Sequence, residues 1–401
     1  MPANSGIAQA AGGTGALAPR VLFVDHSADP GGGQLGLLRF LQQAPPESIR
    51  PEVALLSGGK LRADFSDAAP STFVLDEDAF SFRKTPLYAY RLRRLIVGRG
   101  YDLIVINSLY AAAVYALLNR CGLARHTGSS YYSRVSMESL TGTKRLVGIR
   151  GIFPVFDAFL ANSAWTASCI PASLGKQRYV AYPVSGIHAP ARSRGTDPCS
   201  SDTIRIVTLS RPDRWKGLDL LVRAVADLAE RYPAKSISVD LYGGDFFSDA
   251  EYLAELDTLV ATSPVKVTRR GHIDDVSTVL SNSDIFVLPT MQPEPFGQSV
   301  AQALAAGCVV IVPDEGGPLE MVRPRETGLV FRARDDASLR DQIVTAVDDP
   351  LLSRRLSHAA MASTEQFEDS ATVQMLLTAV QDMLGSADAE QRLCGRGSSE
   401  D

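Results

Sequence analysis

Cysteine is scarce in this sequence, and long apolar runs are absent from it. The five cysteines among 401 residues are widely scattered and form no CxxC pair, which argues against a disulfide framework. The five histidines show no HExxH spacing, so a structural zinc site is not expected. No apolar run reaches the ~18 residues that a membrane-spanning helix needs, and the first residues do not form a basic-then-apolar secretory signal. We therefore expect a cytoplasmic protein.

The length and charge of the chain bound its organisation. A chain of 401 residues exceeds one ordinary core, which predicts two domains of roughly 150 to 200 residues each. The net charge of −5 hides an asymmetry, because residues 21–186 carry 18 Lys and Arg against 12 Asp and Glu. A basic surface that faces an anionic partner and two unrelated surfaces are both compatible with this imbalance. No aromatic-interleaved basic motif is present, so nucleic acid is not an expected partner.

Short apolar runs alternate with amphipathic stretches along most of the chain. Val21–Val24 and Leu103–Ile106 are typical of buried parallel strands followed by helices, and the same rhythm restarts at Ile204–Leu209. This pattern predicts an α/β protein with two doubly wound, Rossmann-like domains that face each other across a cleft. The predicted parts are a disordered segment over 1–19, a first domain over 20–186, a linker over 187–203, a second domain over 204–369, a helix over 370–385 that can pack on either domain, and a flexible tail over 386–401.

The first glycine-rich turn follows the first predicted strand. In Asp29–Gln34, three successive glycines precede a helix that we expect to begin near Leu35. Glycines at such a place let backbone N–H groups approach an anion at the positive end of the helix. A tight turn needs glycine as well, so a structural role and an anion-binding role both remain open.

Two further segments carry chemistry at predicted strand ends of the second half. Arg211 and Lys216 follow Ile204–Leu209, where their charges can converge on one phosphate group; a solvated basic turn is the other interpretation. Glu294 lies just before a helix that should begin near Gly297, and its carboxylate can accept hydrogen bonds from sugar hydroxyls. A charge at a helix N-terminus is the alternative role for this glutamate.

The second half resembles the donor-binding domain of the retaining glycosyltransferases of family 4, which have the GT-B fold. The resemblance runs almost continuously from Ile204 to about Phe331, and the first half agrees more loosely. The segments that carry it are Ser210–Gly217, Leu241–Gly244, Gly271–His272, Ser283–Thr290, Glu294–Gly307, Gly316–Glu320 and Thr327–Phe331, with Gly31–Gly33, Tyr101–Ser108 and Phe156–Ser163 in the first half.

This resemblance implies a role for each matching residue. Arg211 and Lys216 would hold the diphosphate of a nucleotide sugar and stabilise the leaving group, while Glu294 would bind hydroxyls of the donor sugar. The main chain at His272 and Ile273 would flank the nucleobase. The other expected donor contacts are Gly32, Gly33, Ser210, Gly244, Phe296, Gly297, Gln298, Ser299, Val300 and Gln302, and Asn107 and Arg134 are expected to contact the acceptor or the donor sugar.

The sequence departs from the family pattern at two places. Gln302 stands where the family has a second glutamate for the ribose, so the charge-assisted hydrogen bond is lost although an amide can still bind a diol. The family's frequent His-Asp near residue 132 is replaced by Tyr131–Arg134. Asp76–Asp78 matches the D-x-D pattern of metal-dependent enzymes of another fold, but we interpret it as a solvated loop and expect neither a metal nor another cofactor.

The predicted function is retaining, metal-independent transfer of a sugar from a nucleotide-diphosphate sugar to a hydroxyl of a carbohydrate, lipid-linked or small-molecule acceptor. An epimerase or phosphorylase of the same fold, and a sugar-nucleotide-binding protein with a weakened site, remain alternatives. The stretches Arg91–Arg99 and Lys144–Phe153 mix basic and apolar residues. They are compatible either with ordinary helices or with peripheral contact to the inner face of a membrane.

Overall fold

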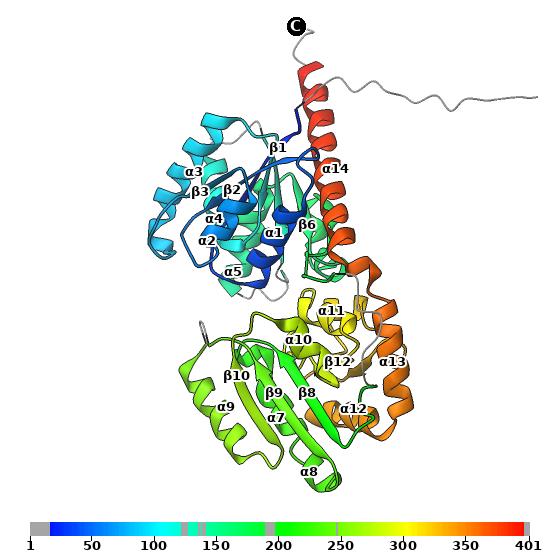
Figure 1. The fold of residues 1–401 in the computed structure, drawn as a ribbon. Helices are drawn as coiled ribbons and strands as arrows, with labels where there is room; N and C mark the ends of the chain where they lie inside the picture. The colour runs from blue at the N-terminus through cyan, green and yellow to red at the C-terminus, as the bar shows by residue number, and fades with distance from the viewer. Residues whose placement is uncertain are drawn as a thin grey trace, which may run out of the picture.

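The computed structural model describes residues 17–121, 127–134, 137, 142–188, 197–245 and 248–396, with side chains up to residue 386. The predictions for residues 1–16, for the linker residues 189–196 and for residues 397–401 lie outside these ranges. Figure 1 shows two domains, one above the other, with the last helix running alongside the first domain.

The first domain is built on a seven-stranded sheet whose spatial order is β3-β2-β1-β4-β5-β6-β7. All its strand pairs are parallel. The strands are β1 (Arg20–Asp25), β2 (Arg50–Leu55), β3 (Ser71–Val74), β4 (Leu103–Ile106), β5 (Gly128–Ser133), β6 (Ala158–Ala161) and β7 (Gln177–Val180).

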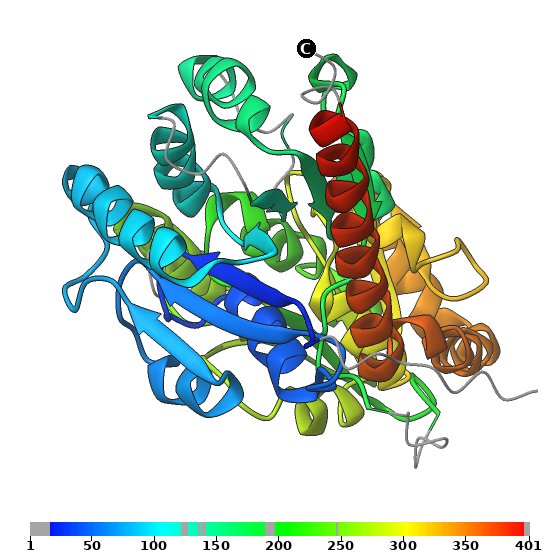
Figure 2. The same cartoon turned by 90° about the horizontal axis from the view of Figure 1, so that it is seen from above.

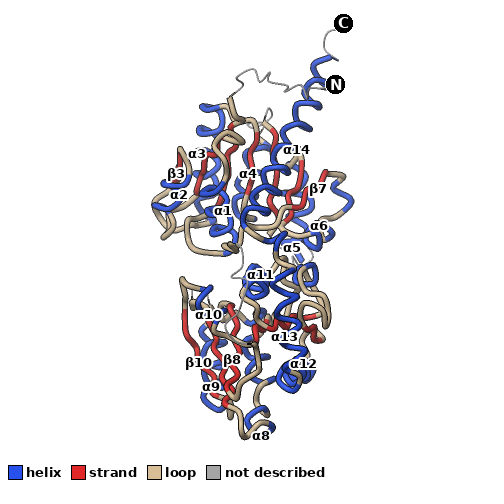
Figure 3. Tube along the Cα trace, turned by 45° about the vertical axis from the view of Figure 1, so that its right-hand side comes forward, coloured by secondary structure: helices blue, strands red, loops and turns tan. Residues whose placement is uncertain are grey.

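The second domain repeats the design with a six-stranded parallel sheet in the order β10-β9-β8-β11-β12-β13. In Figure 3 the strands of the first sheet lie in the upper domain and those of the second sheet lie in the lower domain. The strands are β8 (Thr203–Leu209), β9 (Ser236–Tyr242), β10 (Lys266–Gly271), β11 (Ile285–Val287), β12 (Val309–Pro313) and β13 (Leu329–Phe331).

Helices cover both faces of each sheet, which explains the continuous apolar runs of the strands. In β1, Val21 and Phe23 belong to one core, whereas Leu22 and Val24 belong to the core on the opposite face. Figure 2 shows helices on both sides of the first sheet. The helices are α1 (Gly32–Gln43), α2 (Arg62–Ala68), α3 (Thr85–Arg99), α4 (Leu109–Arg120), α5 (Gly142–Val147), α6 (Ala164–Ser168), α7 (Leu218–Ala224), α8 (Leu228–Arg231), α9 (Ala250–Thr262), α10 (Val276–Ser281), α11 (Gln298–Ala305), α12 (Asp336–Asp348), α13 (Pro350–Ala362) and α14 (Asp369–Arg396).

This architecture confirms the predicted fold class of two Rossmann-like α/β domains. In each sheet the strand order reverses once, between β1 and β4 in the first sheet and between β8 and β11 in the second. Ligands of open parallel sheets bind beyond the carboxyl ends of the strands at such switch points. The fold therefore directs attention to the loops that follow these four strands.

The last helix differs from the sequence prediction in its length. We expected it to end near residue 385 and a flexible tail to follow, but α14 continues to Arg396. Residues 387–393 are mostly Ala, Glu, Gln, Arg and Leu, which favour helix and extend an already formed one at little cost. Val373, Leu377 and Val380 of α14 lie in the core of the first domain, so this helix completes that domain.

The carboxylate of Asp369 ties together the two places where the chain crosses between the domains. It accepts hydrogen bonds from the backbone N–H groups of Gly186 at 2.8 Å and Ile187 at 3.0 Å, and from Nε2 of Gln43 at 3.0 Å. The side chain is nearly fully buried. The start of α14 is thus fixed to the outgoing crossover and to α1.

Among the described residues, no helix is both long and apolar enough to span a membrane.

We expect Asp369→Ala to lower the free energy of unfolding by about 3 kcal/mol, because it leaves two buried N–H groups and the Gln43 amide without an acceptor. Urea unfolding followed by circular dichroism measures this change. Asp382→Ala, at an exposed position of the same helix, is the matched control. Equal stability of the two variants would contradict the role of Asp369.

Candidate active site

The predicted phosphate-binding lysine and sugar-binding glutamate contact each other at the switch point of the second sheet. Lys216 follows β8, and its Nζ lies 2.6 Å from Oε2 of Glu294, which follows β11. Each side chain is only 16% exposed, and the Lys216 ammonium also lies 3.9 Å from the ring centroid of Trp215. A cation and a carboxylate are therefore held together at the place where the fold predicts a ligand.

A close backbone approach joins the two loops that carry this pair. Gly217 has a φ of +66°, and a Cβ atom there would lie 2.0 Å from the carbonyl oxygen of Pro289. The N–H of Met291 donates to the carbonyl of Trp215 at 2.7 Å. A residue other than glycine at 217 would push the loops after β8 and β11 apart, and Lys216 away from Glu294.

The segment around Glu294 is held in place by Gly316–Glu320, one of the segments that carry the resemblance. The N–H of Gly317 donates to the carbonyl of Glu294 at 2.8 Å, and a Cβ atom at Gly317 would lie 2.1 Å from the carbonyl oxygen of Pro295. Phe296 is buried in the core, and α11 begins two residues later, with Gly297 as its N-cap. The helix N-terminus at Gln298 and Ser299 consequently opens beside Glu294.

Two hydroxyl groups at this edge lack hydrogen-bond partners within the described part of the chain. The hydroxyls of Ser210 and Thr290 are buried there without a hydrogen bond. Arg211 lies 3.1 Å from Asp213 and is 45% exposed. Buried hydroxyls without partners are uncommon in folded proteins, and a ligand can satisfy them. The carboxyl edge of the second sheet therefore carries two buried hydroxyls without hydrogen-bond partners among the described residues and the positive charges of Arg211 and Lys216.

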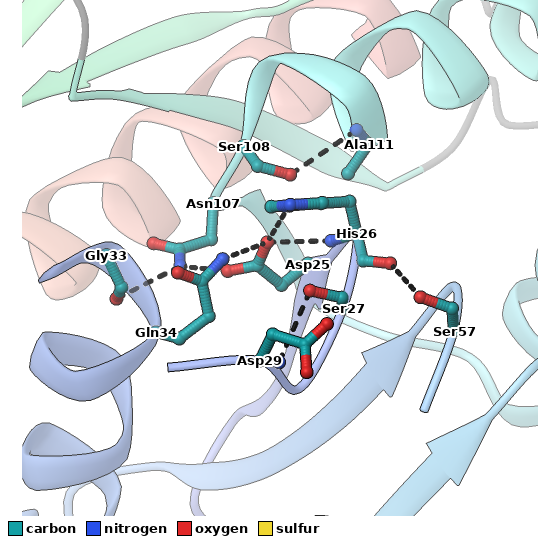
Figure 4. Close-up of polar contacts among 10 residues, drawn as sticks. All are labelled: Asp25, His26, Ser27, Asp29, Gly33, Gln34, Ser57, Asn107, Ser108 and Ala111. Carbon is teal, nitrogen blue, oxygen red and sulfur yellow. Dashed lines mark hydrogen bonds and ion pairs between the residues drawn. The ribbon is translucent and has the colours of Figure 1, made fainter. Parts of the chain in front are cut away.

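The carboxyl edge of the first sheet carries a network that the sequence analysis missed. The buried carboxylate of Asp25, at the end of β1, accepts hydrogen bonds from Nδ1 of His26 at 2.8 Å, Nε2 of Gln34 at 3.1 Å and Nδ2 of Asn107 at 2.5 Å (Figure 4). Burial alone would raise the pKa of Asp25, but the hydrogen bonds from the side chain and backbone N–H of His26 and from Asn107 lower it below its ordinary value. Asp25 and Asn107 each follow an apolar strand run directly, which is the signal in the sequence that could have found them as a pair.

The glycine-rich turn lies on this network. Nδ2 of Asn107 also approaches the carbonyl of Gly33 at 3.4 Å (Figure 4). Arg134, which follows β5, stacks on the ring of Tyr132 at 4.0 Å, and a Cβ atom at Gly33 would lie 3.3 Å from its Cδ. Among the described residues, no carboxylate lies within ion-pair distance of Arg134. The structure therefore brings Gly33, Asn107 and Arg134 together, and it begins α1 at Gly32 rather than near Leu35.

The two edges meet across the domain boundary. Nε2 of Gln298 donates to the carbonyl of Gly32 at 2.8 Å, and Oγ of Ser163 donates to the carbonyl of Pro295 at 2.6 Å. Glu320 accepts hydrogen bonds from the N–H groups of Ala164 at 3.1 Å and Trp165 at 2.6 Å, at the start of α6. These bonds place the glycine-rich turn of the first domain directly against the N-terminus of α11.

Some predicted site residues lie apart from this centre. His272 and Ile273 follow the edge strand β10, two strands away from β8, and the His272 ring lies 3.2 Å from Asp274. Gly244 is buried after β9. Nε2 of Gln302 donates to the carbonyl of Ser185 at 2.6 Å, so that this amide nitrogen is engaged by the interdomain crossover. The predicted contacts of these residues with a donor stay predictions.

The two aspartates of the D-x-D pattern form ion pairs with a lysine of the same domain. Nζ of Lys84 lies 2.6 Å from a carboxylate oxygen of Asp76 and 2.6 Å from one of Asp78. The described residues contain no group of three or more His, Cys, Asp or Glu side chains that could hold a metal ion. The loop 76–78 is thus bound to the chain's own cation.

Comparison with known proteins shows which family model the second half of the chain matches. Residues 196–362 match the family model described as glycosyl transferases group 1. The chain is 27% identical over 308 residues to the GDP-mannose-dependent α-(1-6)-phosphatidylinositol monomannoside mannosyltransferase of Mycolicibacterium smegmatis, covering 72% of this chain and 75% of that protein. It is also 29% identical over 176 residues to the D-inositol 3-phosphate glycosyltransferase of Nocardia farcinica, covering 43% of this chain and 39% of that one.

Solved structures share the fold at low sequence identity. The crystal structure of HepE from Anabaena in complex with UDP and glucose superposes with a TM-score of 0.75 at 21% identity, covering 90% of this chain and 99% of that one. The sucrose-phosphate synthase of Thermosynechococcus elongatus gives a TM-score of 0.75 at 19% identity, covering 92% of this chain and all of that one. These likenesses identify the arrangement of the two domains as the GT-B fold.

We expect Glu320→Ala to weaken domain closure by about 3 kcal/mol, because three hydrogen bonds from the first domain end on this carboxylate, including one from the Tyr182 hydroxyl at 3.1 Å. The radius of gyration measured by small-angle X-ray scattering should increase. Glu326→Ala removes an exposed carboxylate of the same domain and is the control. A radius unchanged from that of the wild type in both variants would show that Glu320 does not hold the domains together.

Proposed function

We propose that this chain, which is a glycosyltransferase of the GT-B type acting on a nucleotide sugar and an acceptor, uses the loops at the two switch points as its active site. In this proposal Lys216 and Arg211 hold the diphosphate, and Glu294 binds hydroxyls of the donor sugar. The observation that carries it is the Lys216–Glu294 pair at the switch point, beside two buried hydroxyls without partners in the described chain. The family match favours transfer over the epimerase, phosphorylase and binding-protein alternatives.

The pairing of Lys216 with Glu294 also suggests how the donor enters. When a diphosphate binds Lys216, the ammonium exchanges one carboxylate partner for two phosphate oxygens, and the Glu294 carboxylate becomes available for sugar hydroxyls. Both groups remain compensated throughout, so neither is left as an isolated charge in a partly buried site. One ion pair thus provides the partners for both halves of the donor.

The positive groups of the cleft would then stabilise the leaving group. As the bond between the anomeric carbon and the phosphate oxygen breaks, negative charge grows on that oxygen, and Lys216 and Arg211 are placed to stabilise it. Arg134 and the glycine-rich turn that it packs against both belong to the first domain. Its positive charge would add to those of Lys216 and Arg211 when the two domains are closed on each other. We propose transfer with retention at the anomeric carbon, without a divalent ion, a cofactor or nucleic acid.

Lys216→Ala tests this assignment. We expect it to reduce the release of nucleoside diphosphate at least about a hundredfold, because the principal charge on the leaving group is removed. The assay measures hydrolysis of radiolabelled UDP-, GDP-, ADP- and dTDP-sugars, which needs no acceptor, with and without EDTA. Lys266→Ala removes an exposed lysine at the opposite end of the second sheet and should retain full activity. Near-wild-type hydrolysis by Lys216→Ala would refute the phosphate assignment, and hydrolysis of none of these donors would contradict the proposed function.

Peripheral membrane contact is a further part of the proposal. The described residues of α5 expose Lys144 and Arg145 together with Leu146 and Val147, which are 50% and 55% exposed. Basic and apolar side chains on one short helix suit an anionic lipid surface, where a lipid-linked acceptor would be presented. The acceptor would then reach the cleft from the side of the first domain.

We expect the chain to cosediment with vesicles that contain phosphatidylglycerol and to be released at high salt, since the attraction is screened. The double variant Lys144→Glu, Arg145→Glu should reduce the bound fraction severalfold. Vesicles of phosphatidylcholine alone are the control. Equal binding to both vesicle types, or none to either, would contradict an electrostatic contact.

A further inference from the structure

A histidine held by a buried carboxylate stands at the switch point of the first sheet and has no role in donor binding. Oδ1 of Asp25 lies 2.7 Å from the backbone nitrogen of His26 and 2.8 Å from its Nδ1 (Figure 4). Gln34 and Asn107 donate to the same carboxylate. With its pKa lowered, Asp25 stays ionised near neutral pH and acts only as an acceptor in this network.

The ionised carboxylate determines which nitrogen of His26 is available. Because Asp25 accepts at Nδ1, the proton of the neutral ring sits on Nδ1, and Nε2 presents a lone pair. Within the described part of the chain, Nε2 has no hydrogen-bond partner, and the side chain is 26% exposed. The carbonyl of His26 is also bound by the hydroxyl of Ser57 at 2.9 Å, which holds the backbone in place. The result is an oriented acceptor nitrogen that is open to a donor group.

Aromatic rings pack against the His26 ring. The ring of His26 packs edge-to-face on Phe80 and on Tyr110, with centroids 5.9 Å and 5.3 Å apart. Tyr110 in turn packs edge-to-face on Phe82, with centroids 4.9 Å apart. Phe82 is 62% exposed and Tyr110 is 42% exposed. We call His26, Phe80, Phe82 and Tyr110 the aromatic platform; its members follow β1, β3 and β4.

The aromatic platform is anchored to the donor side of the cleft. Asn107 donates both to Asp25 behind His26 and to the carbonyl of Gly33 in the glycine-rich turn. The neighbouring carbonyl of Gly32 accepts from Gln298 of the second domain. In addition, Oδ1 of Asn107 is buried without a partner among the described residues, at a side chain only 3% exposed. A ligand that reaches this strand end from the platform would find an unsatisfied acceptor there.

The chemistry of the platform selects among ligands. An exposed aromatic surface favours the C–H face of a ring, because the negative π-face attracts weakly positive C–H groups. Nε2 of His26 needs a hydrogen-bond donor, and a hydrocarbon chain would bury it unsatisfied. An anionic group is disfavoured by the charge of Asp25 behind the ring. A neutral ring that carries hydroxyl groups satisfies all of these conditions.

We propose that the aromatic platform is the acceptor subsite and that it binds a pyranose or cyclitol ring. The C–H face of the ring stacks on Tyr110 and Phe82, and one ring hydroxyl donates a hydrogen bond to Nε2 of His26. His26 is then a residue that positions the acceptor, and Asp25 positions His26. This inference rests on the proposed function, because it supplies the acceptor for the same cleft.

Saturation-transfer NMR on the full chain tests the subsite, with methyl α-D-mannopyranoside and myo-inositol as probes in the presence of UDP, GDP, ADP or dTDP. We expect transfer to the C–H protons of at least one probe in the wild type and in Tyr110→Phe, which keeps the ring. Tyr110→Ala should reduce the signal about fivefold or more. His26→Phe, which keeps an aromatic ring but removes Nε2, should weaken binding by a similar factor. Leu351→Ala, at an exposed apolar position of the second domain, is the control.

Nucleotide binding, measured by calorimetry on each variant, separates the two hypotheses and also shows that the variants are folded. A wild type that binds none of UDP, GDP, ADP and dTDP contradicts the proposed function. A wild type that binds nucleotide but transfers saturation to neither probe overturns the subsite, as do equal signals in Tyr110→Ala and the wild type. Loss of vesicle binding in Tyr110→Ala with an unchanged ring signal would assign the platform to lipid instead.

Discussion

The cleft of this protein depends on the Asp369 carboxylate, which binds both crossings of the chain between its domains. One buried side chain accepts hydrogen bonds from the outgoing crossover at Gly186 and Ile187 and from Gln43 of the first domain. From this point α14 runs along the first domain and completes its core. Two domains linked by a single strand of chain would be free to rotate. Two crossings joined at one carboxylate restrict that rotation.

At the carboxyl edges of the two sheets, the buried and partly buried charges have partners. Lys216 pairs with Glu294 and Arg211 with Asp213, while Asp25 accepts hydrogen bonds from His26, Gln34 and Asn107. Partly buried charges need such partners, because an uncompensated charge removed from water is costly. In the function proposed above, substrates would bind by exchange of partners, which limits the electrostatic cost of each step. Arg134 differs, since no carboxylate of the described chain lies within ion-pair distance of it.

The sequence predicted the fold class and the two groups of strand-end loops correctly. Apolar runs such as Val21–Val24 identify buried parallel strands, and in a parallel sheet all their following loops gather at one edge. It did not reveal the Asp25 network. That network joins residues 25, 34 and 107, and nothing in the local pattern of any one of them indicates the other two. The length of α14 was also underestimated, because composition alone does not show where a helix is already nucleated.

The sequence by itself therefore determined what the strands and helices are, which residues stand at their carboxyl ends, and which family model the second half matches. Only the tertiary structure decided which of those residues meet: Lys216 with Glu294, Gly32 with Gln298, and His26 with the rings of Phe80 and Tyr110. Strand order and domain closure set these contacts. Both result from burial of apolar surface between segments far apart in the chain, and hydrophobic burial is not directional enough to be read from local sequence.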